Sequence, residues 1–243
     1  MNKREFTQVR SILKKEIDKF LKVYKRMPSR KELQNLILKI QRKLTTELNS
    51  AISNALKLVY VKTGITVARE LGNKFIFDKI DYNALKVLQT QPVVRQSFAG
   101  LSQDISNKLQ DLFDIIYNDP KGYSKKKLID GVKSIAEVSD WRAELIARTE
   151  TAKISNGARY VQYKKSPEFN NFIFKWIGPS DSRTTDTSKR IKNRVGNGVT
   201  YDELFKIVSE ESIKDFPNWV VRYDAIVSHY NSRHSFVKVG VLK

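Results

Sequence analysis

The stretch from Arg142 to Arg159, RAELIARTETAKISNGAR, constrains the fold of this chain more than any other. Its strong helix formers and small residues, with no proline among them, predict a helix. One stripe at helical spacing is apolar except for Glu150, with Ile146 one turn before it and Ile154 one turn after. Because a carboxylate in such a place is costly unless it is paired, we expect Glu150 to be buried and paired. The helix would then form the base of a polar network inside a small domain.

Helical patterns dominate the chain as far as residue 164. Apolar residues recur at helical spacing over residues 3–26, 33–71, 81–89 and 92–118, and a capping box of Ser29 and Glu32 opens the second of these helices. A short helix should begin at Ser124, and another should cover about 140–164. The first two helices predict an N-terminal hairpin, which is either an arm packed in a bundle or a projecting interaction arm.

The pattern changes after residue 166. Phe172–Ile177 alternates as a strand does, and Ser235–Val239 forms a second candidate strand. Between them we expect a polar turn at 181–186, a short helix ending at Arg194, a helix over 201–210 that opens with a capping box of Thr200 and Glu203, and an irregular loop over 211–228.

The predicted fold class is therefore α+β and predominantly helical. A long N-terminal helical hairpin or bundle is followed by a small α+β domain with a short β-sheet. We divide the chain into a basic helical arm, residues 1–91, and an α+β domain, residues 92–243, with helices over 92–164 and strands and loops over 165–243.

The formal net charge of +19 is unevenly distributed. Residues 1–80 hold 19 Lys and Arg against 7 Asp and Glu. Such a field favours a polyanion, either double-stranded DNA bound without sequence preference or an acidic protein surface, although a solvated lysine-rich surface has the same composition. The candidate binding residues are Lys14, Lys15, Lys22, Lys25, Arg26, Lys39, Arg42 and Lys43.

Several classes of function are disfavoured. The absence of cysteine excludes disulfides and thiol catalysis, and two histidines make a structural metal site improbable on composition. No apolar run is long enough to span a membrane, and the charged N-terminus has no secretory signal core. The histidines at 229 and 234 are too close for a His-Asn-His nuclease, and no G-x-S-x-G elbow occurs. We therefore expect no catalytic residue, no cofactor, no bound metal and no membrane partner.

Polar side chains cluster at four places in the last hundred residues: Arg148 to Glu150, Asn156 with Arg159, Asp181 to Thr184, and His229 to His234. Glu150 needs a cation, for which Arg183 and Arg233 are the candidates, and Asp181 needs one that Arg148 or Arg159 could supply. Such pairs would hold helix, turn and terminal strand in register. The predicted structural network comprises Arg148, Glu150, Asn156, Arg159, Asp181, Arg183, Thr184, His229, Asn231, Arg233 and His234.

The order of these pieces resembles the head morphogenesis domain of tailed phages, the Mu F-like minor capsid protein family. The resemblance covers about residues 100–243. It lies in the IARTET helix with Asn156 and Arg159 behind it, the Lys175-Trp176 strand, the D-x-R-T turn Asp181–Thr184, and the element His229–His234, which is similar to the family's H-P-N-C-R-C.

The chain departs from that family pattern at four positions. Ser188 stands where the family often has a histidine, Ser232 and His234 replace the two cysteines, and Tyr230 replaces the proline. In relatives those side chains could hold a metal. In this chain we predict that hydrogen bonds, in place of a metal, connect the side chains at these positions.

The resemblance implies a structural role in a virion. The chain would be a minor capsid or head morphogenesis protein inside the head near the portal, made in the host cytoplasm and present in several copies around the portal. It would contact the portal protein, other capsid proteins and packaged DNA, and would aid procapsid assembly and DNA packaging or ejection. The alternatives are a non-specific DNA-binding protein, a nuclease or toxin of a mobile element, and a protein–protein adaptor.

Overall fold

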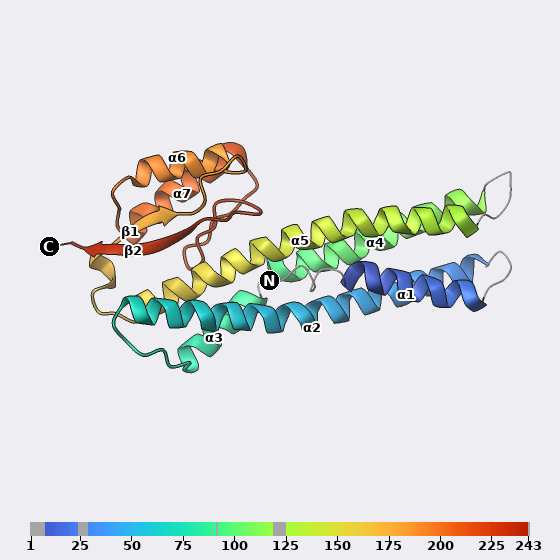
Figure 1. Ribbon diagram of the computed structural model, residues 1–243, viewed down its shortest axis with the longest axis horizontal. Coiled ribbons are helices and arrows are strands. Elements are labelled where there is room, and N and C mark those ends of the chain that lie inside the picture. The colour runs from blue at the N-terminus through green and yellow to red at the C-terminus, as the bar shows by residue number, and fades with distance from the viewer. Residues whose placement is uncertain (1–7, 24–28, 91, 119–124, 243) are drawn as a thin grey trace. The chain divides into compact units, whose positions relative to one another are not determined.

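The computed structural model describes residues 8–23, 29–90, 92–118 and 125–242 (Figure 1). The chain forms two compact units, each built from two separate segments. Unit 1 combines Met1–Asn54 with Pro92–Ile146, and unit 2 combines Ala55–Gln91 with Ala147–Lys243. Two long helices, α2 (Arg30–Glu70) and α5 (Lys125–Lys164), therefore contribute to both units.

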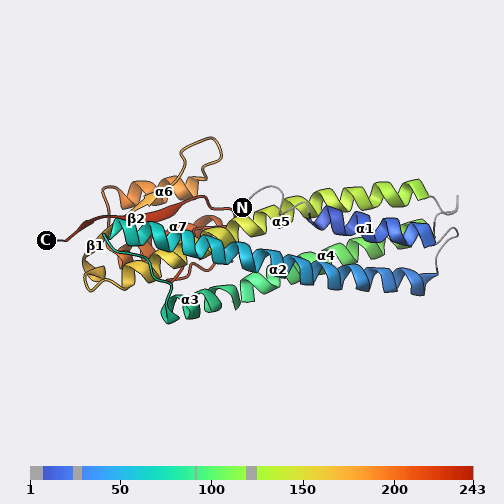
Figure 2. The ribbon, with the colours of Figure 1, turned by 60° about the horizontal axis from the view of Figure 1, so that its bottom comes forward.

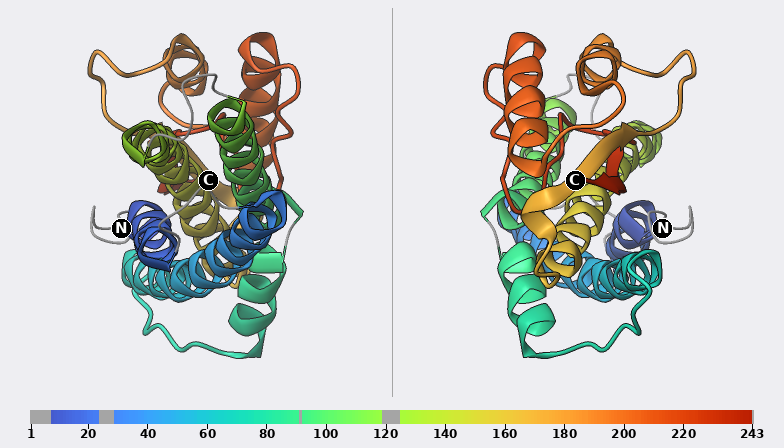
Figure 3. Two further views of the ribbon diagram at one scale, coloured as in Figure 1. Left: turned by 90° about the vertical axis from the view of Figure 1, so that its right-hand side faces the viewer. Right: turned by 90° about the vertical axis from the view of Figure 1, so that its left-hand side faces the viewer.

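Unit 1 contains α1 (Gln8–Val23), the first part of α2, α4 (Pro92–Tyr117) and the first part of α5. The helices α4 and α5 run antiparallel, because Gly131 of α5 lies against Leu112 while Arg142, further along α5, pairs with Asp104, earlier in α4. Gln41 and Thr45 of α2 bond to Gln103 and Ser102 of α4. Figures 2 and 3 show these helices side by side.

The core of unit 1 consists of apolar stripes at helical spacing, which include most of the residues predicted from the sequence and some that were not. Each helix contributes residues at three- and four-residue spacing, which places them on one face. The buried residues are Ile12, Leu13, Ile17 and Phe20 from α1, Leu33, Leu36, Ile37, Ile40 and Leu44 from α2, Leu101, Ile105, Leu109, Phe113 and Ile116 from α4, and Leu128, Val132, Ile135, Ala136, Ala143 and Ile146 from α5.

Unit 2 is built around a two-stranded antiparallel sheet of β1 (Phe172–Ile177) and β2 (Ser235–Val241). The register pairs Ile177 with Ser235 and Phe172 with Val241, with an irregularity between Ile173 and Phe174. Both α6 (Asp186–Val195) and α7 (Tyr201–Asp215) pack on β1 and on each other (Figure 1). A short 3-10 helix, Phe169–Asn171, precedes β1.

An aromatic core joins the sheet to the helices of unit 2. Phe172, Phe174 and Phe236 from the strands meet Tyr163 of α5 and Tyr201 of α7 in edge-to-face and tilted contacts. Such pairs stabilise beyond the apolar area that they bury. This core fixes the C-terminal half of α5 beside the terminal strand, and so it positions the polar residues described below.

The helix α3 (Lys79–Thr90) also belongs to unit 2. Asp78 and Asp81 cap its start reciprocally, since each carboxylate accepts from the other residue's backbone N–H. Asp81 is fully buried and also accepts from Tyr60, Gln162 and Lys165. A buried carboxylate with this many donors is well satisfied, so it holds α2, α3 and α5 together within the unit.

The predicted fold class is confirmed, and the elements differ from prediction in detail. The two helices expected after Ser124 form one continuous helix, α5, because no proline separates them and the buried stripe continues through Ile135, Ala136 and Ala143. The helix expected over 201–210 continues to Asp215, inside the segment expected to be a loop. The helix predicted over 3–26 reaches beyond the described residues at both ends. The Ser29–Glu32 capping box is present in both directions.

The packing units do not follow the single division expected between residues 91 and 92. Residues 1–91 are shared between the units because α2 is long enough to place its apolar stripe in both. The start of the family domain at residue 92 stays a prediction.

Candidate functional site

Glu150 is buried, as its place in the apolar stripe predicted, with 2% of its surface exposed. Its cation is Lys153, whose Nζ lies 3.3 Å from Oε1, and not Arg183 or Arg233. Lys153 is also buried and lies over the Trp219 ring, 5.1 Å from its centroid. Burial raises the pKa of Glu150 and lowers the pKa of Lys153, and each partner partly opposes the shift of the other. The expected pairing with an arginine was wrong because a partner three residues along the same helix is nearer.

Neutral hydrogen bonds tie α5 to the terminal segment. The Asn156 amide donates to the Ile226 carbonyl at 2.6 Å and accepts from the Ser235 hydroxyl at 2.5 Å. The Thr149 hydroxyl accepts from the backbone N–H of Asn231, which has a φ of 59°. Asparagine tolerates this left-handed conformation better than most residues. The link between helix and terminal element therefore exists, and it uses amides and hydroxyls in place of ion pairs.

The D-x-R-T turn carries the arginine–carboxylate pair that links it to the terminal element. Both Asp181 oxygens accept from the Arg233 guanidinium, at 2.8 and 2.5 Å. The hydrogen bonds from Arg233, opposed by a little desolvation, hold the pKa of Asp181 well below its usual range. Thr184 closes the turn, because its hydroxyl donates to the Pro179 carbonyl and accepts from the Asp181 N–H. Arg183 is exposed and lies 3.6 Å from Asp181.

The other two predicted arginines do not reach Asp181. Arg159 faces Glu70, with 3.6 Å between Nη1 and Oε1, and Arg148 is exposed on α5. The expectation that either would neutralise Asp181 was wrong, since Arg233 takes both carboxylate oxygens. Of the predicted cations, only Arg233 links the turn to the terminal element by a bidentate pair.

His229 sits in a hydrogen-bonded pocket of hydroxyls. Its Nδ1 lies 2.6 Å from the Tyr230 carbonyl, which can only accept, so Nδ1 carries the proton and Nε2 is the acceptor. The Thr185 hydroxyl lies 2.9 Å and the Ser188 hydroxyl 3.4 Å from Nε2. The ring stacks on Phe216, and burial lowers the pKa of His229. The imidazole is therefore neutral at pH 7.

His234 occupies a different environment. Its ring stacks on Trp176, with 7° between the planes, over Gly178, where any Cβ would collide with the imidazole. The backbone N–H of His234 donates to the Ser232 hydroxyl, and burial lowers the pKa of the ring.

The positions that could hold a metal in relatives thus carry two imidazoles and two hydroxyls. Metal sites in proteins use thiolates, carboxylates and imidazoles, so this donor set fits a structural zinc poorly. Within the part of the chain that the structure describes, no three His, Asp or Glu residues gather as a metal site would require. Hydrogen bonds join Ser188 to His229, and Ser232 to Ser228.

The basic residues form a second candidate site, on α1 and α2 of unit 1. Lys14, Lys15 and Lys22 are exposed on α1, and Lys39 and Arg42 are exposed on α2. Lys39 and Lys43 flank the buried carboxylate of Glu16, at 3.1 and 2.8 Å, and the hydrogen bond from Lys43 is the largest cause that lowers the pKa of Glu16 to about 2. Lys25 and Arg26 lie outside the described residues.

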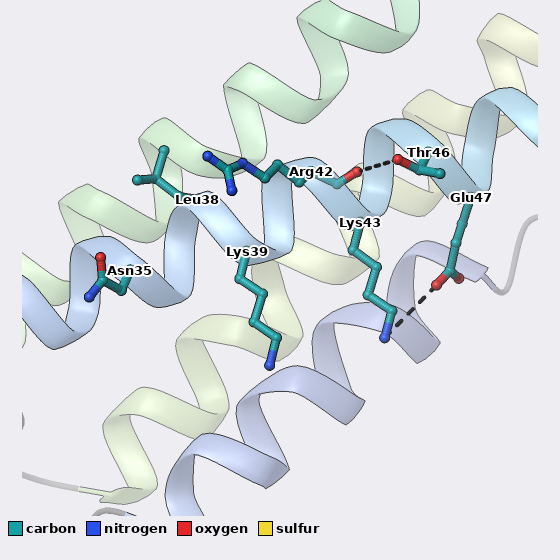
Figure 4. Close-up of a pocket in the computed structure, with 7 residues that line it drawn as sticks. All are labelled: Asn35, Leu38, Lys39, Arg42, Lys43, Thr46 and Glu47. Atoms are coloured by element: carbon teal, nitrogen blue, oxygen red, sulfur yellow. Dashed lines mark hydrogen bonds and ion pairs between the residues drawn. The ribbon is translucent and has the colours of Figure 1, made fainter.

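A shallow hollow of about 500 Å³ runs along the outer face of α2 (Figure 4). It is lined by Asn35, Leu38, Lys39, Arg42, Lys43, Thr46 and Glu47. Of its charged groups, Lys43 bonds to Glu16 and also lies 3.9 Å from Glu47. With the neighbouring Glu16 counted, three cations meet two carboxylates, and the net of +1 suits an anionic partner.

Sequence reasoning missed several residues that build these sites. Lys153 could have been found from its i+3 spacing to Glu150. Thr149 and Ser235 could not, because their partners are more than 75 residues away in sequence. Glu211 was also missed: it is buried and binds Arg190, Arg194 and Lys214, which fastens α6 to α7.

Comparison with known families identifies the segment that carries the helix and the turn. A family model described as phage Mu protein F like protein matches residues 116–214. That segment is Mu F-like. The match runs from the end of α4 into α7, so it contains Glu150, Asn156 and the D-x-R-T turn. Neither the curated proteins nor the solved structures include a match to this chain.

The Mu F-like family implies a phage head morphogenesis protein, and that family is structural rather than catalytic. In the Mu F-like segment, Glu150, Asn156 and Asp181 serve as hydrogen-bonding and ion-pairing groups within unit 2. Across the ranges that the structure describes, no helix is long and apolar enough to cross a membrane.

Proposed function

We propose that this chain is a minor head protein of a tailed phage, placed inside the capsid near the portal and in contact with packaged double-stranded DNA. The observation that carries the proposal is the Mu F-like match over residues 116–214. It relates residues 116–214 to a head morphogenesis family and leaves open what the chain touches. We infer the position in the capsid, the DNA contact and the portal as partner from that relationship and from the net positive charge of the chain.

The charge of unit 1 supports the DNA contact. Residues 1–54 hold 14 Lys and Arg against 5 Asp and Glu, while residues 92–146 hold eight of each. The excess therefore comes entirely from the segment that carries α1 and the start of α2. Exposed cations without a base-reading motif favour phosphate contacts, which are sequence-independent and depend on salt.

The DNA contact is tested by neutralising exposed cations. Lys14, Lys15, Lys22 and Arg42 are changed to Gln, and a control variant carries four Gln substitutions at Lys57, Lys62, Lys108 and Lys126, which are also exposed. We expect the first variant to bind duplex DNA more weakly and to lower the slope of log affinity against log salt by up to about 4, from about 0.9 for each lost contact. Equal slopes in the two variants would remove α1 and the first part of α2, residues 30–54, as the DNA-binding surface.

The position in the particle is tested separately. We expect the chain to co-purify with procapsids and to bind the isolated portal protein of the same phage. Density at another site in a virion reconstruction would contradict the portal assignment. If the chain cut plasmid DNA in Mg²⁺, the nuclease alternative would replace the structural one.

A further inference from the structure

Unit 1 exposes a tryptophan on the outer face of α5. Trp141 is 65% exposed, whereas the other two tryptophans of the chain, Trp176 and Trp219, are 2% and 8% exposed. Val138, one turn before it, is also exposed. Large exposed aromatic side chains of this kind are typical anchors of protein interfaces.

The surroundings of Trp141 are acidic. Glu137 lies one turn before it and Glu144 one turn after, on the same side of the helix. The basic residue next to Trp141, Arg142, is itself paired with Asp104 of α4. The partner of this face should therefore be basic, with room for one large apolar side chain.

The outer face of α2 has both properties. Asn35, Leu38, Lys39 and Arg42 follow the spacing i, i+3, i+4, i+7, which is the set of four residues that forms a hole for a knob from a facing helix. Leu38 is about half exposed and supplies an apolar contact, and Arg42 supplies a cation (Figure 4). Lys39 and Lys43 add two cations that share the Glu16 carboxylate. An arginine at the rim can also stack on the indole ring.

We propose that Trp141 of one copy of this chain inserts into the α2 hollow of a second copy. Glu137 then lies beside Lys39 and Arg42 of the neighbour. The two faces lie on different helices of unit 1, so every copy offers both a knob and a hole, and successive copies can associate head to tail. A single helix–helix contact is small, so the association is weak and concentration-dependent. The inference does not rest on DNA contact or on the portal.

The test uses the full-length chain, freed of nucleic acid, by sedimentation velocity from about 1 to about 200 µM at low salt, the range of weak complexes. Wild type is expected to associate, and Trp141→Ala to raise the dissociation constant at least about 30-fold, as the loss of a central tryptophan anchor does. The matched control is Val23→Ala, which truncates another exposed side chain of unit 1, on α1 and outside both proposed faces, and should change nothing. A wild type that stays monomeric throughout overturns the proposal, as does a Trp141→Ala variant that associates like wild type.

A charge-reversal pair keeps the test independent of packing at residue 141. Arg42→Glu and Glu137→Lys should each fail to self-associate, and their mixture should form a complex, because the first retains the native acidic face and the second the native basic face. A mixture that stays monomeric overturns the proposal. Iodide quenching gives a second readout, since the exposed Trp141 should become protected as concentration rises.

DNA retention separates this proposal from the proposed function. Trp141→Ala should bind duplex DNA with an unchanged salt slope, since it removes no cation. A chain that binds no DNA would refute the DNA contact and leave self-association standing.

Discussion

Glu150 and Lys153 form a buried ion pair. Removing only one of the two side chains should lower the free energy of unfolding more than removing both. With 3.3 Å between Oε1 and Nζ, the Coulomb attraction at an effective dielectric of about 20 is about 5 kcal/mol. Both groups are almost fully buried, and the desolvation penalty of several kcal/mol per ion offsets most of that attraction. The pair therefore contributes little net stability as a pair.

Glu150→Met leaves the Lys153 ammonium buried without its carboxylate, and should lower the free energy of unfolding by about 3–5 kcal/mol at pH 7. Lys153→Met should cost a similar amount. The double variant should lie within about 2 kcal/mol of wild type, because it removes both penalties and loses only the contact of Lys153 with Trp219. The cycle should thus give an interaction energy of at least about 3 kcal/mol.

The assay is urea unfolding followed by fluorescence of Trp176 and Trp219, which are buried in unit 2, with circular dichroism alongside. Measuring the free energy of unfolding at several pH values tests the direction of the pKa shift of Lys153. Burial lowers the pKa of Lys153, so in Glu150→Met the unfolded state binds more protons and stability should rise with pH. An interaction energy below about 0.5 kcal/mol, or a Glu150→Met variant that is as stable as wild type, would refute this account of the pair.

Three further predictions concern other ionisable groups. Asp181→Asn should speed amide hydrogen exchange in β2, because Arg233 loses its bidentate partner, whereas the exposed Arg183→Ala should have little effect on the same amides. Glu16, whose pKa is lowered to about 2, stabilises the folded state fully above pH 4.5 and progressively less as the pH falls toward 2, so the melting temperatures of wild type and Glu16→Gln should differ at pH 7 and converge near pH 2. Because burial lowers the pKa of His229, unit 2 should lose stability as the pH falls below 6.5, and His229→Gln should flatten that dependence between pH 7 and 5; equal slopes would contradict the neutral assignment of the ring.

The helical part of the fold could be predicted because its signals are local. Apolar residues at three- and four-residue spacing mark the buried faces of α1, α2 and α4, and the Ser29–Glu32 box marks the start of α2. The strand β1 is equally legible, since its buried and less buried residues alternate. The extension of α7 to Asp215 was missed because its last turn is mostly polar, apart from Ile213, and Glu211 is buried only through cations of α6.

The sequence by itself determined that Glu150 is buried, since a helix must place that position between Ile146 and Ile154. Which cation meets it, and which meets Asp181, was decided only by the tertiary structure. An ion pair depends on distances of a few ångströms, and those distances follow from how α5, the turn and β2 are packed. Four arginines were chemically equivalent candidates in the sequence, and packing gave Arg233 to Asp181 and left Glu150 to Lys153.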